Sequence, residues 1–256
     1  MADRLTTLAT VALILAGCSA ALTAPRQVVD AASVWDRMLA AKGGREKLHA
    51  VHTLVVSTRD PLAGFSRRDV AGGLKYEIVA AFPDRFWWWS DYRPGKLGFD
   101  VQVWNRTARW WWATSNGRAA GQPEWGPPLE SDRRLEVLQL AYLLETQFVQ
   151  PRLLRAFEIS GKAGRRVVVE AATPSTSRVR YTVDPTTYLP ESVEIGTEGT
   201  AYQFSSWVNV DGIRMPQQDG KIALHFLINP NVDPKLFETP PDNVTSADAW
   251  KTFLRK

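Results

Sequence analysis

The chain has 256 residues, a length that fits one domain or two small ones. Hydrophobic residues make up 45% and charged residues 23%, which is typical of a globular protein and excludes disordered, collagen-like and low-complexity chains. The formal net charge of +4 is modest and does not indicate nucleic acid as a partner. One cysteine excludes an internal disulfide framework, and three histidines leave little room for a metal centre. We expect neither a metal nor a cofactor.

The first residues have the pattern of a secretory signal peptide. Arg4 is followed by a stretch from Leu5 to Gly17 without charges, which is too short for a comfortable membrane span. Residues 15–18 read Leu-Ala-Gly-Cys and resemble the lipobox of bacterial lipoproteins. The resemblance implies cleavage between Gly17 and Cys18 and acylation of Cys18, with chains such as palmitate as a membrane anchor. A plain secretory signal and a short N-terminal anchor are the alternatives.

The residue after the cysteine bears on the destination. It is Ser19 and not Asp, which among such lipoproteins fits the outer membrane, with the chain facing the periplasm. No clean domain boundary follows. We therefore divide the chain into a signal peptide over 1–17, a tether over 18–25 and a single domain over 26–256.

Two helices open the predicted domain. Asp30 can cap a helix whose apolar face recurs at helical spacing, and Gly43-Gly44 ends it. A second, short helix is predicted from Arg45 to Ala50. Strands then follow, separated by short breaks rich in turn residues, as in antiparallel hairpins. They are predicted at 54–58, 74–81, 85–91, 96–104 and 109–114.

The longest helical segment starts at Ser131 and is predicted to end before Pro151. Its apolar residues cover nearly the whole circumference, so we expect it to be buried inside something curved. Further strands are predicted at 157–160, 165–171, 178–183, 191–195, 200–208, 213–215 and 221–228, with a short helix around 247–254. Antiparallel strands without helical crossovers predict a mainly β (α+β) fold. We expect a curved antiparallel sheet that forms an unclosed half-barrel around the buried helix, with small helices at its N-terminus.

Tryptophan is the compositional oddity, since eight of the 11 fall within 39 residues, from Trp87 to Trp125. In a strand, Trp87 and Trp89 point one way and Trp88 the other, and Trp110 and Trp112 likewise share a face. Such indoles could line a cavity for acyl chains. The predicted lining is Trp87, Trp89, Trp110, Trp112, Leu138 and Tyr142. A tryptophan-rich core without a ligand and a sugar-binding aromatic platform are the alternatives.

Catalytic signatures are missing from the sequence. It contains no HExxH, GxSxG, Walker or GxGxxG motif. Glu46 lies one helical turn before His49, a spacing that is more often a surface pair than an acid–base couple. We predict no catalytic residue, with an unrecognised hydrolase as an alternative.

Four stretches form an ordered set of motifs: 41–54, with Ala-Lys-Gly-Gly-Arg-Glu-Lys-Leu; 181–190, ending Thr-Tyr-Leu-Pro; 204–216, with Val-Asp-Gly-Ile-Arg-Met-Pro; and 229–240, ending Phe-Glu-Thr-Pro. Together they resemble the LolA/LolB-like superfamily of outer-membrane lipoprotein-sorting proteins. The resemblance implies an unclosed antiparallel barrel with a hydrophobic concave side that takes acyl chains. It carries over no functional residue, since these motifs are structural turns. The expected function is a lipid-anchored, non-enzymatic protein that binds lipid or lipoprotein acyl chains. The alternative is a scaffold lipoprotein that binds another envelope protein.

Overall fold

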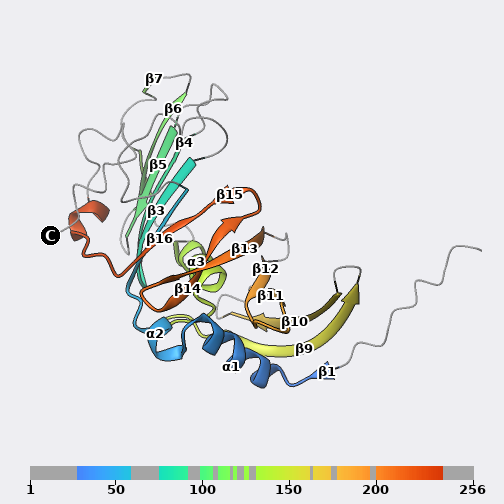
Figure 1. Cartoon of the computed structure of the whole chain (residues 1–256). Helices are drawn as coiled ribbons and strands as arrows, with labels where there is room; N and C mark the ends of the chain where they lie inside the picture. Colours follow the sequence, from blue (N-terminus) through green and yellow to red (C-terminus); the bar gives the residue numbers. More distant parts are fainter. Residues whose placement is uncertain are drawn as a thin grey trace, which may run out of the picture.

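The computed structural model describes residues 28–58, 75–91, 99–105, 109–115, 118–119, 124–126, 131–161, 164–173, 178–196 and 200–238. The strands form two antiparallel sheets that do not close into a barrel (Figure 1). The predicted class, a mainly β fold with an unclosed antiparallel sheet around a helix, is confirmed. The strands are divided between two sheets of eight and do not form one continuous curved sheet.

The first sheet holds the N-terminal strand and most of the second half of the chain. In spatial order it contains β1 (Val28–Val29), β9 (Arg152–Gly161), β10 (Gly164–Ala172), β11 (Arg178–Val183), β12 (Pro190–Ile195), β13 (Thr200–Val210), β14 (Ile213–Asp219) and β15 (Ile222–Ala223). The strand β1 lies within the predicted domain, two residues after its predicted start at 26.

The second sheet holds the tryptophan-rich strands. Its order is β16 (His225–Ile228), β2 (Thr53–Ser57), β3 (Lys75–Ala81), β4 (Arg85–Asp91), β5 (Phe99–Trp104), β6 (Arg109–Ser115) and β7 (Arg118–Ala119), with β8 (Glu124–Gly126) paired to β6. The chain therefore returns near its C-terminal end to add β16 beside β2, at the edge of this sheet.

Helix α3 (Ser131–Leu143) lies between the two sheets, with β2–β6 on one side and β9–β13 on the other (Figure 1). Leu138 and Tyr142 are buried in one core cluster with Leu54 and Val56 of the second sheet and Val193 of the first. This placement confirms that the apolar circumference of the helix is buried.

Two aromatic contacts and one hydrogen bond tie α3 to its surroundings. The Tyr142 ring lies 5.2 Å from Phe226 of β16 and 5.8 Å from Phe204 of β13, centroid to centroid. The Tyr181 hydroxyl of β11 donates to the Leu140 carbonyl oxygen at 3.1 Å. The helix therefore has fixed neighbours in both sheets.

The N-terminal helices follow their local signals. Asp30 caps α1 (Ala31–Lys42) by accepting from the amides of Ala32 and Ser33. Gly43 has φ 128°, a conformation that favours glycine, and the helix ends there. Helix α2 (Arg45–His49) follows directly.

Helix α3 is shorter than predicted, because it ends at Leu143 and not just before Pro151. Leu144 takes a left-handed conformation with φ 68°. The Thr146 hydroxyl then accepts from the amides of Phe148 and Val149, both at 3.1 Å, and holds a turn in place of a further helical turn.

The reason for the early end is a buried carboxylate. Glu145, with a 6% exposed side chain, accepts from Trp35 Nε1 at 2.8 Å and Arg45 Nε at 2.6 Å, and bonds His49 Nε2 at 2.9 Å. These contacts come from α1 and α2, about a hundred residues away. Burial by itself raises the pKa of Glu145, but the hydrogen bonds from Arg45, Trp35 and His49 outweigh it, and the pKa is lowered.

A row of alternating charges crosses the outer face of the first sheet, away from α3. Arg155, Glu170, Arg180 and Glu194 are neighbours in register on β9, β10, β11 and β12. Arg155 Nε lies 2.7 Å and Arg180 Nη2 3.0 Å from the Glu170 carboxylate, whose side chain is 1% exposed. The hydrogen bond from Arg155 is the main reason that the pKa of Glu170 is lowered.

The tryptophan-rich sheet is apolar on both faces. Phe86 and Trp88 face α3, while Trp87 and Trp89 face the other way and are buried with Val55, Val79, Val101, Val103 and the 3₁₀ helix η2 (Pro234–Phe237). No helix among the described residues is both long and apolar enough to cross a membrane. The predicted signal peptide, the tether and the helix around 247–254 lie outside the described residues.

The hydrogen bonds and ion pairs of Glu145 predict that the protein loses stability in acid. The pKa of its carboxyl is lowered in the folded state, so the stabilisation is complete well above the ordinary value of 4.5 and is lost as the pH falls through the lowered pKa. We expect Glu145→Gln to lower the free energy of unfolding by about 2 kcal/mol near pH 7 and to make it less dependent on pH in acid.

Urea unfolding at about pH 7 and about pH 3 measures this difference. Glu46→Gln on the exposed side of α2 is the matched control and should change the stability by less than about 0.5 kcal/mol. Equal loss in the two variants would contradict the role of Glu145.

Candidate functional site

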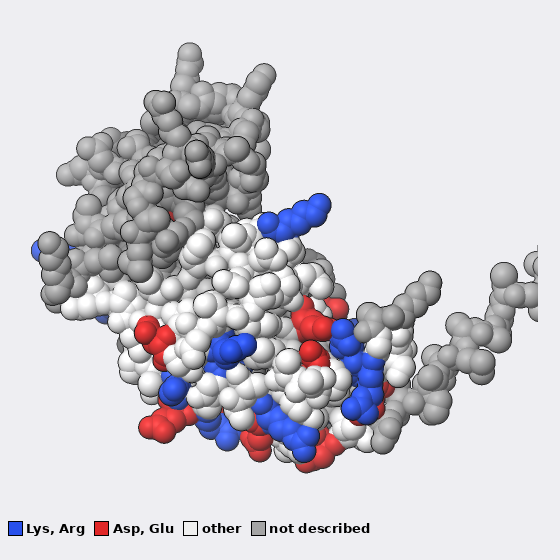
Figure 2. All heavy atoms as spheres, in the orientation of Figure 1, with Lys and Arg blue, Asp and Glu red and all other residues white. Residues whose placement is uncertain are grey.

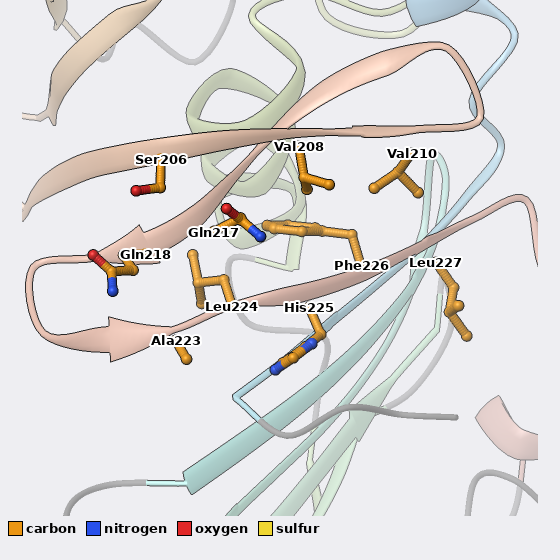
Figure 3. Close-up of a pocket in the computed structure, with 10 residues that line it drawn as sticks. All are labelled: Ser206, Val208, Val210, Gln217, Gln218, Ala223, Leu224, His225, Phe226 and Leu227. Atoms are coloured by element: carbon orange, nitrogen blue, oxygen red, sulfur yellow. The ribbon is translucent and has the colours of Figure 1, made fainter. Parts of the chain in front are cut away.

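A groove of about 450 Å³ opens where the two sheets approach each other at β13, β14 and β16 (Figure 3). This volume is within the range of small-molecule sites. The lining residues are Ser206, Val208, Val210, Gln217, Gln218, Ala223, Leu224, His225, Phe226 and Leu227.

The β13–β14 hairpin forms one wall of the groove. Strand β12 pairs with β13 only over Thr200–Gln203, so the rest of β13 leaves that neighbour and continues with β14 alone. Ser206 has φ 55° just beyond this point. Val208 and Val210, two residues apart, lie on the same side of the strand and line the groove (Figure 3).

Strand β16 forms the opposite wall. Phe226 is 6% exposed and forms part of the floor, and its contact with Tyr142 makes the floor continuous with the core. Leu224 is 3% exposed beside it. His225 and Leu227 point away from Phe226 along the strand, and both are partly exposed.

The lining of the groove is apolar with a polar rim that contains no Asp, Glu, Lys or Arg. Among the ten lining residues the polar groups are two glutamines, a serine and a histidine. Gln218 accepts a hydrogen bond at 2.8 Å from Ser205 of the adjacent strand, which holds its side chain at the rim. Such a surface suits an apolar chain, because burial of apolar area drives binding and a few amides can orient the polar end.

Lys42 fastens the hairpin wall to helix α1. Its ammonium hydrogen-bonds the Arg214 carbonyl oxygen of β14, lies 3.8 Å from Met215 Sδ and 4.8 Å from the Trp207 ring centroid. Burial, and next the charge of Arg214, lower the pKa of Lys42 to about 7. Trp207 lies between Ser206 and Val208, so this contact supports the strand that lines the groove.

The predicted cavity lining is not brought together on one face. Leu138 and Tyr142 pack in the core between the sheets, whereas Trp87 and Trp89 are 0% and 2% exposed in a second cluster on the far face of the second sheet. The predicted alternation is right, but the paired indoles face away from the helix. The space expected to be a cavity is occupied by α3 itself.

Trp110 and Trp112 lie on β6, opposite Val103 and Val101 of β5. Since Val103 and Val101 are in turn opposite Trp87 and Trp89, the backbone register places all four tryptophans in the same two rows. The side chains of Trp110 and Trp112 lie outside the described residues, as do Gly17 and Cys18.

The histidines are held by different partners. His49 bonds Glu145, His52 bonds the Gln147 side chain at 3.1 Å, and His225 lines the groove. Glu145 is occupied by three donors and acts as a structural joint. Among the described residues, no group of three or more His, Cys, Asp and Glu is arranged to hold a metal ion.

The groove was missed by sequence reasoning. Its strands were predicted, and the alternation around Val208 and Val210 indicates two-faced strands. No local sequence pattern shows that the part of β13 beyond Gln203 approaches β16, because these two strands belong to different sheets.

Comparison with known proteins finds similarity among solved structures. No known family model and no curated protein matches the chain. A solved structure of a LolA superfamily protein from Nitrosomonas europaea is 14% identical, with 82% of this chain and 97% of that chain covered and a TM-score of 0.40. Functional reasoning therefore rests on the residues of this chain.

Trp87 is either a core residue or part of a ligand cavity, and substitution would change the free energy of unfolding differently in the two cases. Its Nε1 is buried with no hydrogen-bond partner among the described residues. As a core residue, Trp87→Ala should lower the free energy of unfolding by roughly 3–5 kcal/mol. Trp87→Phe keeps an aromatic ring and removes the unpaired donor, so we expect a clearly smaller loss.

Urea unfolding of both variants separates the effect of volume from that of the indole N–H. A Trp87→Ala protein as stable as the wild type would contradict the core role.

Proposed function

We propose that the protein is a lipid-anchored, periplasm-facing binding protein, without enzymatic activity, that holds an apolar chain in the groove between β13, β14 and β16. The observation that carries this proposal is the lining of the groove, where five of the ten residues are Val, Leu or Phe and none is Asp, Glu, Lys or Arg. An acyl chain of a lipid or of a lipoprotein is the ligand class that matches it.

The proposed site replaces the cavity predicted from tryptophans. Leu224 and Phe226 give a closed apolar floor, and Val208 and Val210 form a partly exposed apolar wall beside it. A chain laid along this floor exchanges contact with water for contact with these four apolar side chains. Gln217 and Gln218 are placed at the rim to hydrogen-bond a polar end (Figure 3).

A photoactivatable fatty acid tests the groove. We expect cross-linked peptides from β13 or β16 of the extracted, lipidated protein. Val208→Asp should reduce this cross-linking at least about tenfold, because an unpaired charge in an apolar groove opposes binding by well over 1.4 kcal/mol. Phe148→Asp, at a 36% exposed apolar residue outside the groove, is the matched control and should cross-link as the wild type does.

Thermal unfolding of both variants shows that they are folded. Cross-linking spread evenly over the chain, or unaffected by Val208→Asp in a folded protein, would contradict the proposed site.

The lipid anchor has its own test. Cys18→Ala removes the only thiol, so we expect loss of metabolic labelling with palmitate and loss of retention in the membrane fraction. Ser19→Ala should retain both. Labelling that persists in Cys18→Ala would show that the lipobox interpretation is wrong.

A second function is favoured by the filled space between the sheets. With α3 packed there, a scaffold lipoprotein that binds another envelope protein would use the edge strand β16 as its contact surface. This function predicts that no lipid co-purifies with the gently extracted protein in native mass spectrometry, and that the fatty-acid probe finds no preferred position.

A further inference from the structure

The outer face of β1 and β9 carries an exposed apolar strip. Four large apolar side chains are exposed among the described residues, and three of them lie on these two adjacent strands. Val28 is 82%, Leu154 40% and Ile159 37% exposed. Val29 packs against the core, so its neighbour Val28 faces outward.

The backbone register places these residues along two paired strands. Val28 lies opposite Phe157 of β9, and Leu154 and Ile159 flank Phe157 along the same strand. Leu154 is the extra residue of a β-bulge, since the register with β10 shifts between Glu170 and Ala171. Leu154 and Ile159 are five residues apart, which spans about 17 Å.

Arginines flank the strip. Arg155 has a 54% exposed side chain, bonds Glu170 at 2.7 Å, and its guanidinium lies 5.4 Å from the Phe157 ring centroid. Arg166 is paired in register with Ile159 and bonds Glu191. Strands β9 and β10 together carry four arginines and two glutamates. Figure 2 shows charged side chains gathered over the lower part of the molecule, where α1, β9 and β10 lie in Figure 1.

This composition suits the interface of an anionic membrane. Arginine keeps its charged end at the level of the phosphates while its stem covers apolar surface, and it binds phosphate oxygens through two donors. Each exposed Val, Leu or Ile that enters the headgroup and acyl boundary loses unfavourable contact with water.

The position of the strip in the chain, close to Cys18, indicates which surface covers it. Only ten residues separate Val28 from Cys18, so the strip lies within about 36 Å of that residue even with the connecting chain fully extended. With acyl chains on Cys18, the membrane is the surface nearest to the strip. This argument rests on the lipid anchor of the proposed function.

We propose that Val28, Leu154 and Ile159 form a docking strip that lies against the anionic phospholipid surface in which Cys18 is anchored, with Arg155 and Arg166 at the phosphates. The anchor then provides attachment, and the strip gives the domain a defined orientation on the membrane.

Labelling of introduced thiols tests the strip, because Cys18 is the only native cysteine. Ile159→Cys probes the strip, and Lys221→Cys, at an exposed residue between β14 and β15, is the control. The lipidated full-length product is reconstituted into vesicles of phosphatidylglycerol and phosphatidylcholine and treated with a membrane-impermeant maleimide. We expect the thiol at 159 to react about tenfold more slowly than in detergent, since burial of one such side chain shifts an equilibrium by roughly that factor. The thiol at 221 should react at the same rate in both.

Equal rates at 159 in vesicles and in detergent would overturn the proposal. So would equal protection in vesicles of phosphatidylcholine alone, or protection that disappears when the protein is diluted at constant lipid, as expected if a second copy covers the strip. Failure of the anchor is distinguishable, because the wild-type chain would then take up no palmitate in the labelling test of the proposed function.

Discussion

Burial of α3 on all sides is the constraint on which the rest of the structure depends. A helix with an apolar circumference needs cover from two directions, and each sheet provides one. Leu138 and Tyr142 therefore serve the core and do not line an open cavity. Among the described residues, a groove lies at the periphery, where the β13–β14 hairpin and β16 approach each other.

The same demand for cover explains the tryptophans. The sequence Phe-Trp-Trp-Trp over 86–89 makes β4 apolar on both faces, so both faces of the second sheet have to be covered. One face packs on α3, with the Arg134 guanidinium 4.9 Å from the Trp88 ring centroid. The other buries Trp87 and Trp89 with Leu236 and Phe237 of η2. The three indoles of β4 are therefore packed against protein on both faces of the sheet.

Caps, turn residues and alternation in the sequence predicted most helices and strands. They failed where contacts between residues far apart in the sequence determine the structure. Asp30 and Gly43 set the ends of α1 through their own caps, and Arg85–Asp91 was predicted to the residue. The end of α3 was wrong, because Glu145 leaves the helix for partners on α1 and α2 that no local pattern reveals. Alternation predicted that Trp87 and Trp89 share a face but could not tell which face meets the helix. The groove lies beyond local prediction for the same reason, since Val208 and Phe226 come from different sheets.

The alternating row on the first sheet has a consequence for how the strands find one another. Glu170 shares its carboxylate between Arg155 and Arg180, and Arg180 also reaches Glu194 at 3.5 Å. A strand shifted along its neighbour would leave this buried carboxylate without a cation, which is strongly unfavourable. The four side chains therefore favour the native register of β9 to β12. Shifted registers that keep the hydrophobic alternation would still be higher in free energy, because they break these ion pairs.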